Sequence, residues 1–266
     1  MDARHAAGLL VLLVAAAPAP GADAAGNRMA AFASVTPPPA ADGTPDPFAR
    51  HCAVDRRWCA RLREDDAGGR WWLEVIEGAA PAQTFDIAGP NDEDSAFAVW
   101  PLLVVEAGGA VLVGVERTRS TGYSGGGASA TRLVLIRAEP GGGALRQVLE
   151  VPLRAAKEIR ACFGPRDIRR RRGACSDQYE FVATLTLDPA TRAGSPHFLF
   201  SARARTYPGR RALASDSTTA PPLRPSDLRW TVDPVCSYRR RLAFDPGAGR
   251  YLPDRPLPPC ADYFDF

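Results

Sequence analysis

Apolar and polar residues alternate along most of the chain, in short runs separated by clusters of glycine, proline, asparagine and aspartate. A period of two places successive side chains on opposite faces of a strand, so these runs predict β-strands. The clusters between them are short enough to join antiparallel neighbours as hairpins. The pattern predicts five hairpins, in which residues 59–64 pair with 70–77, 96–105 with 110–118, 131–138 with 144–153, 179–187 with 198–206, and 236–244 with 250–251.

Consecutive hairpins predict an antiparallel meander, so we expect an all-β fold shaped as a sandwich or a partly open barrel. Pro101 interrupts one predicted strand, and because proline donates no ladder hydrogen bond it predicts an edge or a bulge there. A short helix or turn competes with strand at residues 155–161 and 227–232. Residues 207–228 are rich in proline, serine and threonine and too long for an ordinary connection, which predicts a mobile surface loop within the same domain.

The N-terminal residues have the features of a cleavable signal peptide. Arg4 supplies positive charge, residues 6–17 are an uninterrupted apolar stretch, and residues 22–24, Ala-Asp-Ala, present small side chains at a cleavage site. The apolar stretch is too short to cross a bilayer as a helix, so we expect no membrane span. We therefore expect residues 1–24 to be removed on export, and the protein to be periplasmic or secreted.

The composition suits one domain after this leader. Residues 25–50 contain proline-rich stretches and almost no large apolar side chains, which predicts a disordered lead-in. Residues 51–266 are then expected to form a single β-rich domain. Lys157 is the only lysine among 33 basic residues, a bias that we attribute to the base composition of the gene rather than to chemistry.

Six cysteines are present in the chain: Cys52, Cys59, Cys162, Cys175, Cys236 and Cys260. An even number of cysteines in an exported chain predicts a disulfide framework. Many pairings are open in principle, and we favour the three nearest-neighbour pairs because each couples positions that flank a turn-rich stretch. Zinc is not expected, because no CxxC spacing occurs and only His51 and His197 remain after the leader is removed.

A serine hydrolase signature occurs at residues 122–126, where Gly-Tyr-Ser-Gly-Gly matches the GxSxG nucleophile elbow. The elbow needs a helix directly after the serine, but glycines and a predicted strand follow Ser124. A nucleophilic serine also needs a base, and His51 and His197 stand in no recognisable order. We therefore favour a glycine-rich binding loop with Tyr123 as a contact residue, and keep an exported serine hydrolase as the alternative function.

Positive charge is concentrated in the C-terminal half. Residues 25–150 carry 12 arginines and 16 acids, a net charge of −4, whereas residues 151–266 carry 20 basic residues and 12 acids, a net charge of +8. A disulfide between Cys162 and Cys175 would constrain the loop that contains the arginine run Arg169, Arg170, Arg171 and Arg172.

Four guanidinium groups on such a loop favour binding to anionic envelope components, such as lipopolysaccharide phosphates, acidic polysaccharide or lipid headgroups. The plainer interpretation is a solvated arginine-rich loop. Nucleic acid is not expected, because the chain is exported and its aromatic residues do not interleave with the arginines.

Other candidate sites are weaker. The acidic turn at residues 91–95 has oxygen ligands suited to calcium, but its order does not match the EF-hand loop. Glu74 and Glu77 are expected on opposite faces of their strand, so they do not pair as glycosidase carboxylates. The five tryptophans could include a sugar-stacking platform, although most tryptophans in a β domain are core residues: Trp58, Trp71, Trp72, Trp100 and Trp230.

Taken as a sequence, the chain is expected to be an exported, non-catalytic β-domain that binds or supports envelope components. No cofactor and no metal ion is expected, and the oligomeric state is left open.

Overall fold

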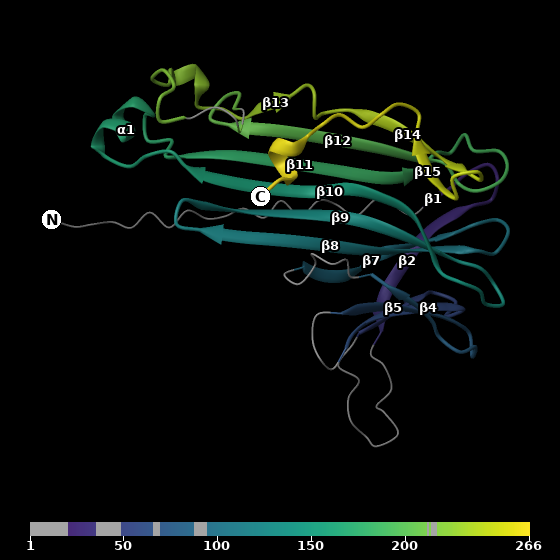
Figure 1. Ribbon diagram of the computed structural model, residues 1–266. Helices are drawn as coiled ribbons and strands as arrows, with labels where there is room; N and C mark the ends of the chain where they lie inside the picture. Colours follow the sequence, from purple (N-terminus) through teal and green to yellow (C-terminus); the bar gives the residue numbers. More distant parts are fainter. Residues whose placement is uncertain (1–20, 36–48, 66–69, 88–94, 212, 214–216) are drawn as a thin grey trace.

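The computed structural model describes residues 21–35, 49–65, 70–87, 95–211, 213 and 217–266. Antiparallel pairing joins 15 strands into one sheet in the order β15-β14-β12-β11-β10-β9-β8-β7-β2-β3-β4-β5-β6, with β1 beside β2 and β13 beside β12 (Figure 1). The sheet is an open meander of hairpins, which confirms the all-β prediction.

The strands are β1 (Gly21–Ala22), β2 (Arg28–Val35), β3 (Arg50–Ala53), β4 (Trp58–Glu64), β5 (Trp71–Glu77), β6 (Gln83–Asp86), β7 (Ser95–Val105), β8 (Val111–Tyr123), β9 (Gly126–Ala138), β10 (Arg146–Arg160), β11 (Ser176–Leu187), β12 (Phe198–Tyr207), β13 (Thr231–Asp233), β14 (Arg239–Asp245) and β15 (Arg250–Pro253). The helical segments are α1 (Pro165–Arg170), the 3-10 turn η1 (Pro225–Asp227) and α2 (Ala261–Phe264).

All five predicted hairpins form, as β4–β5, β7–β8, β9–β10, β11–β12 and β14–β15. Strand β10 continues to Arg160, so strand prevails over helix in most of residues 155–161. At residues 227–232 the end of η1 and the start of β13 share the segment. The bulge predicted at Pro101 is confirmed, because the β7–β8 register shifts between Val99 and Leu103.

Strand β2 belongs to two parts of the sheet. Its first half, from Arg28 to Ala31, pairs with β7, and its second half, from Phe32 to Val35, pairs with β3. Strands β3–β6 are thereby turned across the face of the β7–β9 strands (Figure 1). One strand that changes partners halfway is a recognised way to make a corner between two sheet layers.

The prediction of a disordered lead-in is wrong for residues 28–35, which form β2. The physical reason is that two large apolar side chains, Met29 and Phe32, are enough to fix this strand, each buried in a different core cluster. The proline-rich residues 36–48 lie outside the described residues.

Structure is also found next to the predicted cleavage site. Strand β1 pairs with β2, and the buried Asp23 carboxylate accepts hydrogen bonds from the backbone N–H groups of Ala25 and Asn27 at 3.0 and 2.9 Å. The structure therefore places Asp23, which lies in the segment predicted for removal, in contact with the sheet. Residues 1–20 lie outside the described residues.

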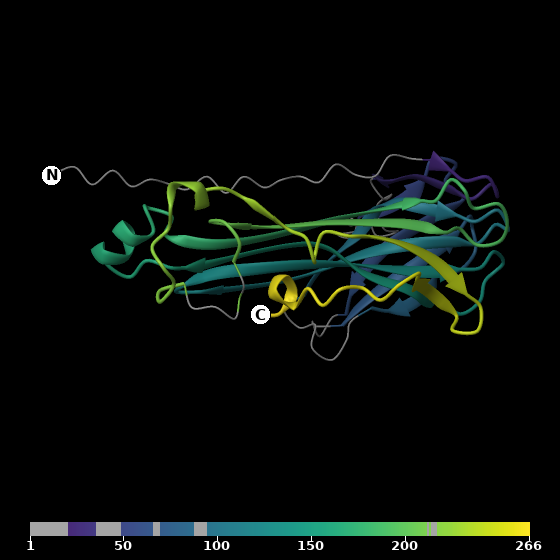
Figure 2. The same cartoon turned by 90° about the horizontal axis from the view of Figure 1, so that it is seen from above.

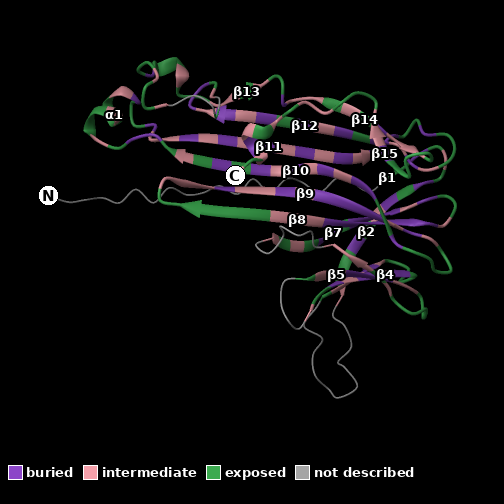
Figure 3. Cartoon of the chain, in the orientation of Figure 1, coloured by how far each residue is buried: buried purple, intermediate pink, exposed green. Residues whose placement is uncertain are grey.

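The central strands are buried on both faces. On β8, Leu112 packs into one core cluster while Val111 and Val113 pack into the other. The first cluster extends over β10–β12 and is covered by the C-terminal segment, and the second lies between β7–β9 and β2–β5. Figure 3 shows this burial concentrated in the half of the sheet where the two layers cross.

The three nearest-neighbour disulfides are confirmed, as Cys52–Cys59, Cys162–Cys175 and Cys236–Cys260. The last of these ties the C-terminal segment to the strand layer. There the buried ring of Tyr263 packs 6.1 Å from the ring of Phe181, centroid to centroid.

We predict that Gly114→Ala on β8 destabilises the fold. A Cβ atom at Gly114 would lie 2.7 Å from Cβ and 2.8 Å from Cε3 of Trp100, which is buried at the bulge. Overpacking of this kind costs about 1–3 kcal/mol in the free energy of unfolding, measurable by urea denaturation. Gly122→Ala on the same strand is the control, because a Cβ there meets nothing within 4 Å; equal losses in the two variants would contradict the prediction.

We also predict a loss of stability at alkaline pH. Burial, reinforced by the Asp177 carboxylate, raises the pKa of Tyr179 from 10.0 to about 12. A raised pKa means that the neutral form is favoured in the folded state, so its contribution is complete below pH 10 and is lost as the pH rises towards 12. Because a shift of this size is worth about 3 kcal/mol, Tyr179→Phe should flatten the fall in unfolding free energy over that interval. The unfolding free energy is measured by urea denaturation at a series of pH values. If it falls as steeply with pH in Tyr179→Phe as in the wild type, the Tyr179 hydroxyl is not the cause of the fall.

Candidate functional site

The β8–β9 turn and the β10–β11 connection meet at one end of the sheet, far from β1 and β2 (Figures 1 and 2). The backbone N–H of Arg160 donates to the carbonyl of Gly125 at 2.5 Å. The Tyr123 hydroxyl donates to the carbonyl of Glu158 at 3.3 Å. The structure therefore brings together the two features that the sequence singled out, the glycine-rich loop and the arginine run.

Helix α1 carries the arginine run out from this end. The disulfide Cys162–Cys175 closes its base, and Pro165 fixes its first turn. The Asp167 carboxylate accepts a hydrogen bond from the backbone N–H of Phe163 at 3.0 Å, which holds the chain as it enters the helix. A short helix on a covalently closed loop presents its side chains in a fixed geometry.

The four arginines of the run differ in exposure and in their hydrogen-bond partners. Arg169 is exposed, but Arg170 donates from Nη2 to the carbonyl of Ala220 at 2.5 Å, and Arg172 donates from Nε to the carbonyl of Leu223 at 2.9 Å. The expectation that four guanidinium groups are displayed is wrong for Arg171, which is only 4% exposed. The helix ends at Arg170, and the next residue turns inward.

Arg171 turns towards a buried carboxylate. Its Nη2 lies 2.5 Å from Oδ1 of Asp177, and its Nε donates to the carbonyl of Ala174 at 2.7 Å. The hydroxyl of Ser217 donates to Oδ2 of Asp177, and Nε of Arg211 lies 3.6 Å from Oδ1. This cluster fastens part of the long excursion at residues 207–228 to the end of the sheet.

We predict that Arg171→Ala lowers the free energy of unfolding by about 3–5 kcal/mol, because it leaves the buried Asp177 carboxylate without its main partner. Arg169→Ala, two residues away on the exposed side, should change it by no more than about 0.5 kcal/mol. Thermal or urea unfolding of the two variants measures the difference. Similar small effects for both would mean that the Arg171–Asp177 pair does not hold this end.

The exposed part of this end is cationic and also carries apolar side chains. We call it the arginine end and define it by seven residues: Arg160, Arg166, Arg169, Arg172, Tyr123, Phe163 and Ile168. Phe163, Ile168 and Tyr123 are 64%, 49% and 46% exposed. The Arg160 guanidinium lies 5.1 Å from the centroid of the Phe163 ring, so charge and aromatic surface are in contact.

The arginines of this end have no acidic partners in the part of the chain that the structure describes. None of the four forms an ion pair there, whereas arginines elsewhere in the sheet, such as Arg137 and Arg205, pair with glutamates at 2.8 and 2.6 Å. Residues 158–172 contain six arginines against two acids, Glu158 and Asp167. The arginine end is therefore a source of uncompensated positive potential.

Phe163, Ile168, Arg160 and Arg166 were not singled out from the sequence. The sequence feature that could have identified these residues is the pair Gly164-Pro165. Proline favours the first position of a helix, so this pair could have indicated a helix inside the disulfide loop. A helix there would have predicted that neighbours in the arginine run point in different directions.

Ser124 lies in a tight hairpin turn, and β9 begins at Gly126, so no helix follows it. His197 lies beyond the far end of β11, whose 12 residues span about 35 Å from the Ser124 end. His51 lies on β3, which β2 and β7 separate from β8. Neither histidine among the described residues can serve Ser124 as a base, so the geometry does not support the hydrolase alternative.

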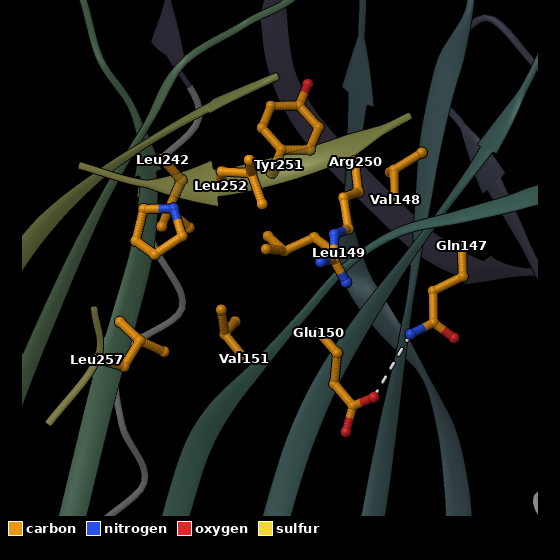
Figure 4. Close-up of a pocket in the computed structure, with 11 residues that line it drawn as sticks. Gln147, Val148, Leu149, Glu150, Val151, Leu242, Arg250, Tyr251, Leu252 and Leu257 are labelled. Atoms are coloured by element: carbon orange, nitrogen blue, oxygen red, sulfur yellow. Dashed lines mark hydrogen bonds between the residues drawn. The ribbon is translucent and has the colours of Figure 1, made fainter. Parts of the chain in front are cut away.

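A groove of about 480 Å³ opens between β10 and the β14–β15 hairpin (Figure 4). Leu149, Val151 and Leu257 line it, and Gln147 and Glu150 lie at its polar side. The Glu150 carboxylate is already engaged, because Oε1 lies 2.8 Å from Nη2 of Arg117 and Oε2 accepts a hydrogen bond from Gln147 at 3.4 Å. Arg250 and Tyr251 are the other charged or polar side chains that line the groove.

The remaining predicted sites are only partly described. Residues 91–94 of the acidic turn lie outside the described residues, and within those residues no three His, Cys, Asp or Glu side chains are placed to hold a metal ion. Trp58 and Trp100 are core residues, whereas Trp72 and Trp230 lie closer to the surface.

Neither helix in the described part of the chain has the length and apolar character needed to cross a bilayer. Comparison with protein-family models, with curated proteins and with solved structures finds no significant match.

Proposed function

We propose that this chain is a non-catalytic binding module that docks through the arginine end onto anionic lipid headgroups of a cell envelope. The single observation that carries the proposal is that four exposed arginines, none of them ion-paired within the described residues, share one end of the sheet with Phe163 and Ile168, which are 64% and 49% exposed.

Both kinds of side chain contribute to such docking. Guanidinium groups form bidentate, charge-assisted hydrogen bonds with phosphate, and each basic side chain near an anionic membrane surface contributes about 1 kcal/mol. Aromatic and aliphatic side chains such as Phe163 and Ile168 gain free energy when they enter the boundary between headgroups and acyl chains. Tyr123 offers a ring with a polar end, which suits the same boundary.

Lipid is favoured over acidic polysaccharide because of these apolar side chains. A polysaccharide chain would satisfy the arginines and could stack on the Phe163 ring, but it offers no apolar environment for the aliphatic side chain of Ile168, which is 49% exposed. The Cys162–Cys175 disulfide and the Arg171–Asp177 pair hold the surface in one arrangement before binding. Less conformational entropy is then lost when the surface docks.

The compartment is proposed on two grounds. Three disulfides with no free cysteine suit an oxidising environment, and the N-terminal residues carry the pattern of a signal peptide. A periplasmic or secreted location would expose the arginine end to anionic lipid headgroups.

The test is cosedimentation of the oxidised protein with vesicles of phosphatidylglycerol and phosphatidylcholine, compared with phosphatidylcholine alone. We expect binding to the anionic vesicles that weakens with salt, and a partition coefficient about 30-fold lower for Arg166→Ser/Arg169→Ser, since two basic side chains contribute about 2 kcal/mol. Phe163→Ser/Ile168→Ser should weaken vesicle binding but leave heparin binding unchanged.

The matched control is Arg192→Ser/Arg250→Ser, which removes the same charge from exposed positions at the opposite end of the sheet. If the control lowers vesicle binding as much as the α1 variant, binding follows net charge and the arginine end is not the docking site. Heparin binding without vesicle binding would identify the partner as a polyanion instead of a membrane.

A further inference from the structure

A second candidate site lies on the outward face of β4, β5 and β6, away from the arginine end (Figure 1). Leu73 on β5 points into the core, so its neighbours Trp72 and Glu74 point outward. The strand register sets Trp72 between Arg63 and Asp86, and Glu74 between Arg61 and Thr84. Trp72 is therefore the one aromatic side chain in two neighbouring cross-strand rows that are otherwise polar.

A pocket of about 410 Å³ is formed there. It is lined by Arg63, Glu64, Asp65, Trp72, Glu74 and Thr84. The volume is within the range of about 300–1,000 Å³ typical of small-ligand sites. Every lining side chain can donate or accept hydrogen bonds, including Trp72 through its indole N–H.

Glu74 is unusual because it points outward and yet is only 6% exposed. Its Oε2 lies 2.5 Å from Nε of Arg61, and its Oε1 lies 3.1 Å from Nη1 of Arg63. Two guanidinium groups therefore offset the cost of burying the carboxylate and fix its orientation. Each carboxylate oxygen keeps a second lone pair, and the Arg63 side chain, 52% exposed, still has donors that face solvent.

Trp72 is not required by the core. Its neighbour Trp71 points the other way and packs against Phe97 with the ring centroids 5.6 Å apart, whereas Trp72 is absent from both core clusters. The Arg70 guanidinium lies over the Trp72 ring, 5.8 Å from the ring centroid. Asp65 adds a buried Oδ1 atom that has no hydrogen-bond partner among the described residues.

We propose that this pocket binds a pyranose unit of a glycan. A sugar ring has apolar C–H faces that suit the indole of Trp72, and equatorial hydroxyls on adjacent carbons that suit planar pairs of acceptors and donors. The Glu74 carboxylate and the Arg63 guanidinium supply such a pair, and Asp65 supplies a further acceptor. The polar lining disfavours an acyl chain, which would leave these charged groups without water or partners.

This site is independent of the lipid docking proposed above, since it uses other strands and other side chains. Its role would be glycan recognition without bond cleavage. Glu74 is held between two arginines, and Glu77 is on the opposite face of β5, so these two glutamates do not act as a pair of glycosidase carboxylates.

The experiment is an array of bacterial and host glycans probed with the oxidised full chain. Hits are then titrated by saturation-transfer NMR with the disaccharide that terminates the bound glycan. We expect Trp72→Ala to weaken disaccharide binding at least tenfold, because the stacking face is lost, and Glu74→Gln to weaken it about tenfold while keeping a residue of the same shape. Saturation transfer should be strongest at the sugar C–H protons that face the indole.

The matched control is Trp230→Ala, which removes another partly exposed tryptophan. The Arg205 guanidinium lies over the Trp230 ring, 4.4 Å from the ring centroid. This variant should leave the affinity unchanged. Circular dichroism tests whether each variant is folded. If Trp72→Ala does not fold, the affinity of Glu74→Gln for the disaccharide decides the outcome. No glycan hit on the array, or equal affinity of the wild type and both site variants, would overturn the proposal. Because vesicle binding does not involve Trp72, failure of either proposal leaves the other standing.

Discussion

Strand β2 is the element on which the architecture depends, because its hydrogen bonds are divided between β7 and β3. Its first half extends the long meander, and its second half starts the β3–β6 layer that crosses over it. Met29 and Phe32 anchor the two halves in different core clusters. Without this change of partner, β8 and β9 would expose one of their two apolar faces to water.

The same corner explains why one end of the sheet can become a surface for binding. The β3–β6 layer covers β8 only over its first part, and from Arg119 onward the strand is exposed. Beyond that point the β3–β6 layer does not cover β8, and this end of the sheet is held by other interactions: the Cys162–Cys175 disulfide, the Arg171–Asp177 pair and the bonds from Arg170 and Arg172 to the long excursion. Arginines therefore have two uses at this end: Arg171 is enclosed and serves the structure, whereas the exposed arginines of the arginine end keep guanidinium donors for a partner.

Local features of the fold could be predicted from the sequence, whereas features set by distant contacts could not. Hairpins, the bulge at Pro101 and nearest-neighbour disulfides follow from period, turn chemistry and spacing within short segments. The strand at residues 28–35 was missed because its burial depends on two layers that the rest of the chain builds. The inward turn of Arg171 was missed for a similar reason, since the position of Asp177 relative to the helix end is set by the return of the chain along β11.

For the candidate sites, alternation predicts that Trp71 and Trp72 face opposite ways, but it cannot tell which of them faces solvent. That depends on which face of β5 the β7–β9 strands cover, a consequence of the corner at β2. The glycine-rich loop and the arginine run could be singled out by composition. Their meeting at one end required the register of β8 through β11, which is fixed by the whole meander.

The single lysine of the chain, Lys157, is a buried cation with a structural role. Lys157 is 5% exposed, and its Nζ donates to the carbonyls of Asp262 and Asp265 at 2.8 Å each, next to the end of α2. Desolvation lowers the pKa of this ammonium, while the two nearby carboxylates act in the opposite direction and help to keep it charged. A compact ammonium can donate to two carbonyls in a confined space, whereas a guanidinium is planar and larger. The cover over the first core cluster therefore rests on a side chain for which the arginines used elsewhere are a poor substitute.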